Sequence, residues 1–365
     1  MTDAASIYSL LSQRAETVDG GGVACVVTTI QAPTTAVLEL AQQCASTNSR
    51  LIVVGDRKSP ANFELPGCEF YSLRRQHETG FRTASAAPEN NYCRKNLGYL
   101  LAIATACEVI RETDDDNRPG YGFFTVPDRR VSAPYITSGE WVNIYAYFSS
   151  QANEMEPLWP RGFPLTKVRT PAPPYESLVS RDVECPIQQG LVAGEPDVDA
   201  ISRLIFGPRT LAFSGRSIAL GEGSWCPFNS QNTTWWRDAF PLLYLPAYCT
   251  FRTTDILRGF VAQRIAWAQG WSLLFHESPV YQDRNQHDLL SDFEQEIPVY
   301  LGSSRIAEEL ERVDIPSGVS GIPDALRLCY EGLLRAGIVV AGELTTLEAW
   351  LADLAAVDTY QDLYA

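Results

Sequence analysis

Three consecutive aspartates, Asp114, Asp115 and Asp116, follow a short predicted strand at residues 108–113. Carboxylates crowded at the end of a buried strand repel one another, and a bound divalent cation is the usual reason that they stay there. Alternate residues at a strand end can reach one ion, so Asp114 and Asp116 are the predicted ligands of Mn²⁺ or Mg²⁺. Asp115 is predicted to contact the ligand that the ion binds. The alternative is a solvated acidic turn without a metal.

Two cations precede the aspartates. Arg94 and Lys95 open a predicted helix at residues 91–106 and bring positive charge to the same edge of the sheet. A metal and cations at the carboxyl ends of parallel strands form a place to hold a diphosphate. The guanidinium of Arg94 suits two oxygens, whereas Lys95 acts as a point charge. The alternative for both residues is a solvated position on the helix.

A nucleotide needs polar groups next to the diphosphate. Asp56 ends the second predicted strand, where a carboxylate can bind a base or a ribose, and a turn or helix cap is an equally good reading. Thr28 and Thr29 end the neighbouring strand and can face the same nucleotide. Lys58, two residues after Asp56, is a further predicted contact.

A carboxylate near a bound diphosphate can act as a general base that deprotonates the hydroxyl of an acceptor molecule. Asp197 and Asp199 form a second acidic cluster in front of a predicted helix at residues 201–205. Carboxylates at a helix N-terminus are often caps, and spacing does not decide which of the two is the base. Asp255 is another candidate base, or a cap of the helix that follows it.

Three further polar residues are candidates for the site. Asn229 and Gln231 lie in a polar run within hydrophobic sequence, so they need hydrogen-bond partners from the backbone or from a ligand. His287 precedes Asp288 and is a candidate neutral metal ligand, although a lone histidine is more often structural.

Composition excludes some classes of protein. The 365 residues carry a net charge of −15 with no basic block, which argues against binding to nucleic acid. The nine cysteines are odd in number and widely spread, which indicates reduced thiols and a cytoplasmic location. No stretch approaches the ~20 apolar residues that cross a bilayer. Any membrane association is therefore expected to be peripheral.

The strands and helices that position these residues alternate along the chain. This order is typical of a doubly wound α/β sheet with its ligand at the carboxyl ends of the strands. The predicted strands are residues 23–30, 51–56, 68–73 and 108–113, and the predicted helices between them are 34–46 and 91–106.

The organisation of the whole chain follows from the same pattern. Residues 1–22 are expected to form a helix and linker, and 23–300 the main domain, with a nucleotide-sugar-binding half (23–130) and an acceptor half (131–300). Residues 301–365 are expected to form a helical cap, with helices at 304–313, 322–336 and 344–363. Seven of the eight tryptophans lie between residues 141 and 271. Aromatic rings suit the C–H faces of a sugar, so this region predicts a carbohydrate cleft, although any single tryptophan is more often core.

Several blocks of the sequence together resemble the STELLO-type glycosyltransferase family. The resemblance covers roughly residues 23–300, and the combination of blocks is more specific than any one of them. The blocks are residues 27–30, 54–60, 92–99, 112–119, 159–165, 188–191, 196–200, 228–233, 255–259 and 284–288.

This resemblance implies a GT-A fold, an α/β mixed sheet in which strand-end aspartates bind a metal and diphosphate. It assigns those roles to Asp114 and Asp116, the base to Asp197 or Asp199, and a further metal ligand to His287. The implied reaction moves a sugar from a UDP- or GDP-sugar to a hydroxyl of a carbohydrate acceptor. Plant members carry a membrane anchor that we do not expect here, so a Golgi location is not expected either. The alternatives are a nucleotide-sugar mutase or self-glycosylating protein, and a non-catalytic nucleotide-binding scaffold.

Overall fold

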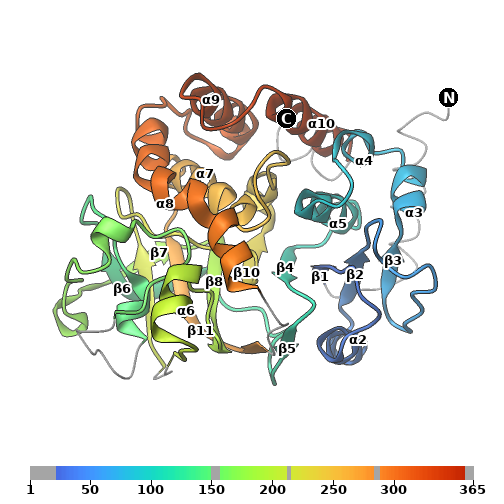
Figure 1. The fold of residues 1–365 in the computed structure, drawn as a ribbon, viewed down its shortest axis with the longest axis horizontal. Coiled ribbons are helices and arrows are strands. Elements are labelled where there is room, and N and C mark those ends of the chain that lie inside the picture. The colour runs from blue at the N-terminus through green and yellow to red at the C-terminus, as the bar shows by residue number, and fades with distance from the viewer. Residues whose placement is uncertain (1–21, 149–156, 212–214, 283–287, 358–365) are drawn as a thin grey trace.

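Four parallel strands form the N-terminal half of a mixed β-sheet (Figure 1). They are β1 (Val23–Thr28), β2 (Arg50–Val54), β3 (Glu69–Tyr71) and β4 (Val109–Thr113), in the order β3-β2-β1-β4. The computed structural model describes residues 22–148, 157–211, 215–282 and 288–357. Helices cover both faces of this half, which is why the strand sequences are apolar without alternation.

Helices α2 (Thr35–Thr47) and α5 (Lys95–Ile103) lie on opposite faces of these strands, as Figure 1 shows. Helix α5 follows a single 3-10 turn, η1 (Tyr92–Arg94). Gly98 lets α5 approach the sheet closely, because a Cβ at this position would lie 2.5 Å from a methyl group of Val26. The close contact of α5 with β1 brings the first residues of the helix to the carboxyl edge of the sheet.

The rest of the sheet mixes parallel and antiparallel neighbours. The order continues from β4 as β10-β8-β11-β9-β6-β7, and β5 pairs with β11. β10 runs antiparallel to both β4 and β8, so it joins the two halves. These strands are β5 (Asn117–Pro119), β6 (Arg130–Ile136), β7 (Ser180–Glu184), β8 (Ile187–Gly194), β9 (Ser217–Leu220), β10 (Asn232–Trp236) and β11 (Leu273–Gln282).

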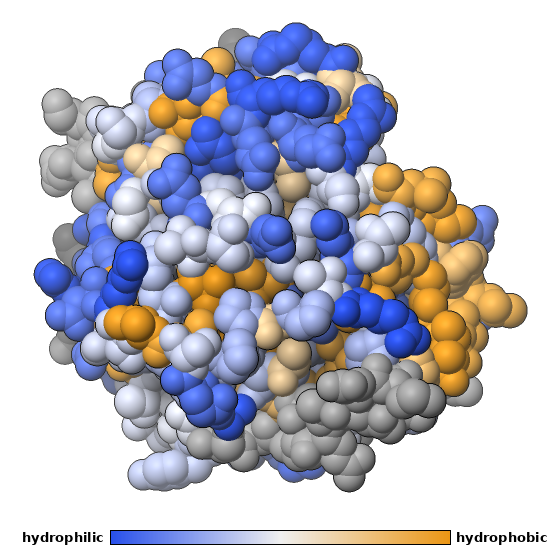
Figure 2. Space-filling view, turned by 90° about the vertical axis from the view of Figure 1, so that its left-hand side faces the viewer, coloured by the Kyte–Doolittle hydropathy of each residue, from blue (hydrophilic) through white to orange (hydrophobic). Residues whose placement is uncertain are grey.

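The remaining helices surround this sheet. The α-helices are α3 (Leu73–Glu78), α4 (Arg82–Ala86), α6 (Ala200–Phe206), α7 (Thr254–Ala268), α8 (Leu289–Glu311), α9 (Ile322–Arg335) and α10 (Gly342–Ala356). The 3-10 helices are η2 (Ile144–Tyr147), η3 (Leu165–Lys167), η4 (Tyr175–Ser177), η5 (Arg237–Leu243) and η6 (Val319–Gly321). Helices α6 and α8 lie in front of the sheet in Figure 1, and Figure 2 shows an apolar region on this side of the molecule, at its right-hand edge.

The C-terminal helices pack into the same core as the sheet. The carboxylate of Glu343 in α10 accepts hydrogen bonds from the backbone N–H groups of Ala247 and Tyr248. The predicted boundary at residue 300 cuts through α8, which begins eleven residues earlier than 300 because Asp288 caps its N-terminus. The helix predicted at residues 304–313 is therefore only the C-terminal part of α8, which continues through Pro298 although proline usually interrupts a helix.

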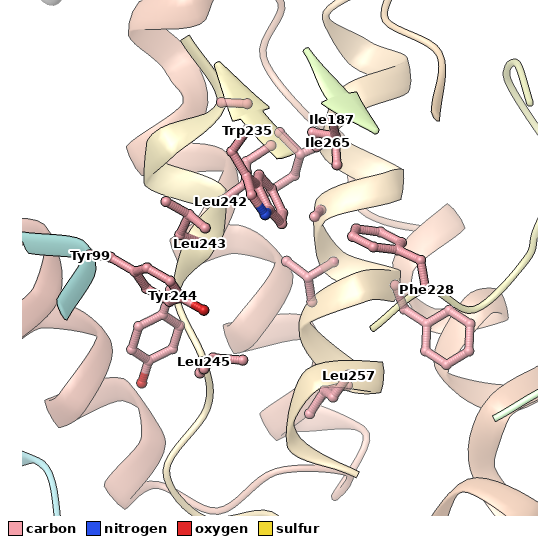
Figure 3. Packing of buried hydrophobic residues seen from close by; sticks show 14 of the residues in the cluster. Tyr99, Ile187, Phe228, Trp235, Leu242, Leu243, Tyr244, Leu245, Leu257 and Ile265 are labelled. Carbon is pink, nitrogen blue, oxygen red and sulfur yellow. The ribbon is translucent and has the colours of Figure 1, made fainter. Parts of the chain in front are cut away.

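The tryptophans belong mainly to the core, so the predicted tryptophan-lined cleft is wrong. Trp235 is fully buried, and Figure 3 shows it beside Leu242 and other side chains of η5 and α7. Its indole N–H donates to Glu112 at 2.8 Å, and Arg258 of α7 forms an ion pair with the same carboxylate at 2.8 Å. This buried group joins β4 to β10 and α7, directly below the aspartates that follow β4.

The predicted α/β class, a doubly wound mixed sheet followed by C-terminal helices, is confirmed. All nine cysteines are free thiols. Across the described residues, no helix is long and apolar enough to cross a membrane. The predicted N-terminal helix, which ends before residue 22, lies outside the described residues.

Candidate active site

A cavity of about 440 Å³ opens at the carboxyl ends of β1, β2 and β4. This is the edge where a doubly wound sheet normally binds its ligand. Residues from the first two strands, from the aspartate run and from α7 all reach it. Its lining includes Thr28, Thr29, Asp56, Lys58, Tyr92, Asp114, Asp115, Asp116, Arg161, Asp197, Ser230, Gln231, Phe251, Arg252, Asp255 and Gln282.

Asp114 is held by two donors at the base of this cavity. The hydroxyl of Tyr92 donates to its carboxylate at 2.8 Å, and the ammonium of Lys95 lies 3.3 Å from the same oxygen. Burial raises the pKa of Asp114 to about 6, and Asp116 adds to the rise, while Lys95 opposes it. A cation placed beside this carboxyl would stabilise its ionised form.

Asp115 and Asp116 point to different partners. Thr29 Oγ1 donates to Asp115 at 2.5 Å, and burial raises the pKa of Asp115. The backbone oxygen of Asp115 accepts from the hydroxyl of Thr34, the residue that caps α2. Gln282 Nε2 lies 3.3 Å from Asp116. Asp115 therefore fixes the loop, and Asp114 and Asp116 are the members of the run that can share an ion.

The oxygen donors fit a hard cation such as Mg²⁺ or Mn²⁺. Such ions are commonly bound by one or two carboxylates together with phosphate oxygens and water. Among the described residues, no group of three or more histidines, cysteines, aspartates or glutamates could hold a metal alone. The pair Asp114 and Asp116 would therefore need phosphate oxygens to complete the site. His287, the third predicted ligand, lies outside the described residues.

Lys95 and Arg94, the two predicted diphosphate contacts, have different partners. The Lys95 ammonium is fully buried and reaches Tyr92, Asp114 and two backbone oxygens. The guanidinium of Arg94 instead donates to Gln76 Oε1 at 2.7 Å and to the backbone oxygen of Ala87 at 2.7 Å. Arg94 is part of the cavity lining and Lys95 is not, but the donors of Arg94 are used by neutral acceptors of the preceding loops, which it therefore stabilises.

Arg161 connects two of the predicted bases. Its guanidinium donates to Asp197 at 2.7 Å and to Asp255 at 2.9 Å, and all three side chains line the cavity. Burial alone would raise the pKa of each carboxyl. Arg161 outweighs burial and lowers the pKa of both, with Arg252 adding to the effect on Asp197. Both carboxylates are therefore ionised at neutral pH.

Asp199 does not line the cavity, so the prediction that it is the base is wrong. Its side chain is completely buried and caps α6 by accepting the N–H of Ser202 at 2.8 Å. The indole N–H of Trp159 donates to its other oxygen at 2.5 Å. Burial raises the pKa of Asp199 to about 6, although these two hydrogen bonds oppose the rise. Asp199 is the cap that the sequence also allowed.

The residues predicted to contact a nucleotide line the cavity. Thr28 and Lys58 line the cavity, as does Asp56, although its carboxylate already accepts the N–H groups of Asn90 and Asn91 at 2.8 and 3.0 Å. That carboxylate joins the loop after β2 to the loop before α5.

The two predicted amides have separate roles. Gln231 lines the cavity, and its side-chain amide lies 3.4 Å from Asn117 Oδ1. Asn229 is not part of the lining, but its amide donates to Asp197 at 2.7 Å and so helps to hold that carboxylate.

Several residues of the cavity were not assigned a role from the sequence. Ser230 Oγ lies 2.6 Å from the Tyr92 hydroxyl and 3.4 Å from Asp255, so two hydroxyls connect Asp114 to Asp255. Arg161 lies in a Trp-Pro-Arg-Gly block, whose one charged residue is the signal that could have identified it. Ser230 and Tyr92 have no comparable signal, because their roles depend on contacts between distant segments.

Comparisons with known proteins agree with the resemblance seen in the sequence. A family model described as STELLO glycosyltransferases matches residues 252–362. Probable glycosyltransferase STELLO2 of Arabidopsis thaliana is 30% identical over 274 residues, which cover 69% of this chain and 35% of the relative. Probable glycosyltransferase STELLO1 of the same plant is 30% identical over 251 residues, which cover 60% of this chain and 30% of the relative.

The chain thus spans about a third of the length of these curated relatives. Among solved structures, one titled "Crystal Structure of a Mycobacterial Protein" aligns with a TM-score of 0.36 and 10% identity, over 82% of this chain and 77% of that chain. The family model and the two plant relatives confirm the predicted resemblance: the chain belongs to the STELLO glycosyltransferase family.

Proposed function

We propose that this chain transfers a sugar from a nucleotide-diphospho-sugar to a hydroxyl of an acceptor. The observation that carries the proposal is the contact between the buried Lys95 and Asp114, at the cavity edge of β4. This edge also holds Asp116 and the nucleotide-side residues of β1 and β2. A buried cation and strand-end acids beside one cavity suit a diphosphate better than an uncharged ligand.

The donor would lie along the carboxyl edge of the sheet. Thr28, Asp56 and Lys58 are suited to the nucleoside end, because they supply hydroxyl, carboxylate and ammonium groups on the β1 and β2 side. Asp114 and Asp116 would hold a divalent cation together with the diphosphate. When bound, that cation would neutralise charge on the departing nucleoside diphosphate.

Asp255 is the base that we favour. It lines the cavity, and the hydroxyls of Ser230 and Tyr92 connect it to Asp114. An ionised carboxylate can take the proton of an acceptor hydroxyl as that oxygen bonds to the sugar carbon and the sugar–phosphate bond breaks. Arg161 keeps Asp255 ionised and fixes its orientation. Asp197 also lines the cavity and is held by Asn229 and Arg252, but no comparable chain of hydroxyls connects it to Asp114 among the described contacts.

A panel of radiolabelled UDP- and GDP-sugars tests this function. We expect release of nucleoside diphosphate from one donor with Mn²⁺ or Mg²⁺, and loss of that release with chelator. Asp116→Ala should abolish the metal-dependent reaction with little effect on the free energy of unfolding. Asp128→Ala, at an exposed aspartate outside the cavity, is the matched control.

The same panel separates the alternatives. Label on the protein itself, or a ring-isomerised donor, would favour self-glycosylation or a mutase over transfer. Binding of a nucleotide without turnover of any donor would favour a scaffold. Full turnover by Asp116→Ala in the presence of chelator would show that the proposed metal has no role in the reaction.

A further inference from the structure

One aromatic ring of the cavity lining is open to solvent. Phe251 lines the cavity and is 57% exposed. Of the aromatic side chains among the described residues, only Tyr92 and Phe251 belong to the lining, and the hydroxyl of Tyr92 is already bound to Asp114. An apolar ring gains free energy by leaving water, so the exposed ring of Phe251 is suited to a ligand that covers it.

Contacts on both sides hold Phe251 in this position. Its ring packs edge-on against the ring of Tyr92, with 5.2 Å between the ring centroids. The hydroxyl of Thr250 donates to the backbone oxygen of Gln295 at 2.6 Å, so the residue before Phe251 is fixed to α8. A ring held in this way can bind a ligand with little loss of its own conformational entropy.

The next residue, Arg252, supplies a hydrogen-bond donor. Its side chain is 8% exposed, and the residue lines the cavity. Nε donates to Glu296 at 2.9 Å, and Nη2 lies 2.8 Å from the same carboxylate oxygen and 3.6 Å from Asp197. Among the described residues, no hydrogen bond or ion pair uses Nη1. Protein carboxylates therefore occupy one edge of the guanidinium, and Nη1 is left for an oxygen of a ligand.

The other two guanidiniums of the lining do not offer such a donor. Arg94 uses Nε, Nη1 and Nη2 for neutral acceptors of the preceding loops, and Arg161 uses all three nitrogens for Asp197, Asp255 and a backbone oxygen. Asp255, the base that we favour, follows Arg252 by three residues and lines the same cavity. An open ring, an unused donor and an ionised carboxylate thus come from one short segment of the chain.

We propose that Phe251 and Arg252 form the subsite for a sugar ring of the acceptor. The inference rests on the proposed function and assigns its acceptor class. The C–H face of the sugar packs on Phe251, an oxygen of the sugar accepts from Arg252 Nη1, and a neighbouring hydroxyl donates to Asp255. Phe251 thus takes the role that the sequence assigned to tryptophans, since none of the eight tryptophans, all in described segments, lines the cavity.

Two rings of the donor compete for Phe251: the nucleobase and the transferred sugar. The residues that suit the nucleoside belong to β1 and to the segment after β2, whereas Phe251 directly precedes α7. The transferred sugar is joined to the diphosphate beside Asp114, whose side chain is 33% exposed, against 57% for Phe251. The more open position suits the molecule that enters after the donor, and the base must contact that molecule. The acceptor therefore fits Phe251 better than either ring of the donor.

Saturation-transfer NMR tests the inference on the whole chain loaded with Mg²⁺ and UDP or GDP, whichever binds. The probes are methyl glucoside, methyl galactoside, methyl mannoside and methyl xyloside, and sorbitol is the control polyol without a ring. We expect saturation transfer to the ring protons of at least one glycoside and none to sorbitol at the same concentration. Phe251→Ala should weaken binding of that glycoside about fivefold, the scale of one aromatic contact, and Phe251→Tyr should retain it. Tyr248→Ala, at an aromatic residue that is 53% exposed and outside the lining, is the matched control.

Arg252→Lys tests the donor separately. Lysine keeps a positive charge beside Glu296 but has no second edge for a ligand, so binding of the glycoside should also fall about fivefold. Urea denaturation checks that the variant is folded. Should Arg252→Lys not fold, the comparison of Phe251→Ala with Phe251→Tyr still decides the inference, because Phe251 is exposed and its replacement does not threaten the core.

Calorimetry with the nucleoside diphosphate and Mg²⁺ separates these results from the proposed function. Its affinity should be the same in wild type and Phe251→Ala. If wild type binds the nucleotide but no glycoside, or if Phe251→Ala binds the glycoside like wild type, the acceptor inference is wrong and the donor site stands. Weaker binding of the nucleotide to Phe251→Ala would assign the ring to the nucleobase, which overturns the inference.

Two further outcomes also decide against it. Extra affinity of the identified donor over its nucleoside diphosphate, lost in Phe251→Ala, would assign the ring to the transferred sugar. Binding of neither UDP nor GDP by wild type would overturn the proposed function, and the acceptor subsite with it.

Discussion

The ammonium of Lys95 is completely buried, yet it lies 3.3 Å from an Asp114 carboxylate that stays 33% open to the cavity. Burying a lysine is costly unless it is well paired. Here the ammonium also has the Tyr92 hydroxyl at 3.0 Å and the backbone oxygens of Thr113 and Ser230 as partners. The ammonium group thus lies directly beneath an acidic cavity floor.

Replacement of this lysine should affect both folding and donor binding. Lys95→Met leaves the buried acceptors without their donor, so we expect the free energy of unfolding to fall by about 3 kcal/mol. It also removes the charge that lowers the pKa of Asp114, which disfavours the ionised carboxylate. The affinity for UDP with Mn²⁺ should fall at least tenfold under conditions in which the variant is folded. Urea denaturation and calorimetry measure the two effects.

Lys167→Met removes an exposed lysine outside the cavity and is the matched control. It should change neither the free energy of unfolding nor the affinity for UDP with Mn²⁺ measurably. Equal UDP affinity in Lys95→Met and wild type would show that the buried charge serves folding alone.

The titration of Asp199 should make the free energy of unfolding depend on pH. Its pKa in the folded protein is about 6, above its ordinary value of 3.8, so the folded state binds this proton more tightly. The contribution of Asp199 to stability is therefore greatest at low pH and is lost as pH rises through 6. Asp199→Ala removes the helix cap and should cost about 2 kcal/mol, with a deficit larger at pH 5 than at pH 8 by about 1 kcal/mol.

Thermal and urea unfolding of wild type and Asp199→Ala at the two pH values measure this difference. Ser291→Ala, at a partly buried serine near another helix start, gives the pH dependence of an uncharged substitution. A deficit that grows with pH would contradict the raised pKa.

Much of the fold follows from the sequence, because local patterns determine it. The apolar runs of β1, β2 and β4 and the helices between them fall within a few residues of their predicted positions. The position of Asp114 and Asp116 follows from the same pattern, since any residue after a parallel strand reaches the carboxyl edge. Distant contacts are different: nothing local to Arg94 indicates that the backbone oxygen of Ala87 and the amide of Gln76 occupy its donors.

The acidic cluster at residues 195–199 illustrates the same limit. Asp197 and Asp199 are two residues apart, a spacing that would place both side chains on the same face of an extended segment. Yet Asp197 lines the cavity and Asp199 caps α6, so the spacing alone does not separate a cavity residue from a cap. Arg161 distinguishes them, because it reaches Asp197 at 2.7 Å while Asp199 accepts from Trp159. The tryptophan-rich region shows that aromatic content alone does not separate a binding cleft from a core.

Kinetics can decide between Asp255 and Asp197, the two remaining candidate bases, with Asp199 as a control. Asp255→Asn keeps the shape of the side chain but removes its charge, so kcat should fall at least a hundredfold while the affinity for UDP with Mn²⁺ is retained. Asp199→Ala should keep the wild-type kcat per folded molecule, because Asp199 does not line the cavity. Steady-state rates with the identified donor, corrected for the folded fraction, measure both. A wild-type kcat in Asp255→Asn would move the role to Asp197.

Arg94 lines the cavity, yet its donors are occupied by neutral acceptors, so its replacement tests whether its guanidinium serves the ligand or only the fold. Arg94→Met removes the donors to Gln76 and Ala87, so these buried acceptors lose their partners and the free energy of unfolding should fall by about 3 kcal/mol. The affinity for UDP with Mn²⁺ should stay within about threefold of wild type, a difference of less than 1 kcal/mol. Calorimetry on Arg94→Met and Lys95→Met, well below their melting temperatures, measures the two affinities for UDP with Mn²⁺. Tenfold weaker binding in Arg94→Met would mean that its guanidinium does reach the diphosphate, because folding loss alone does not change the affinity of the folded fraction.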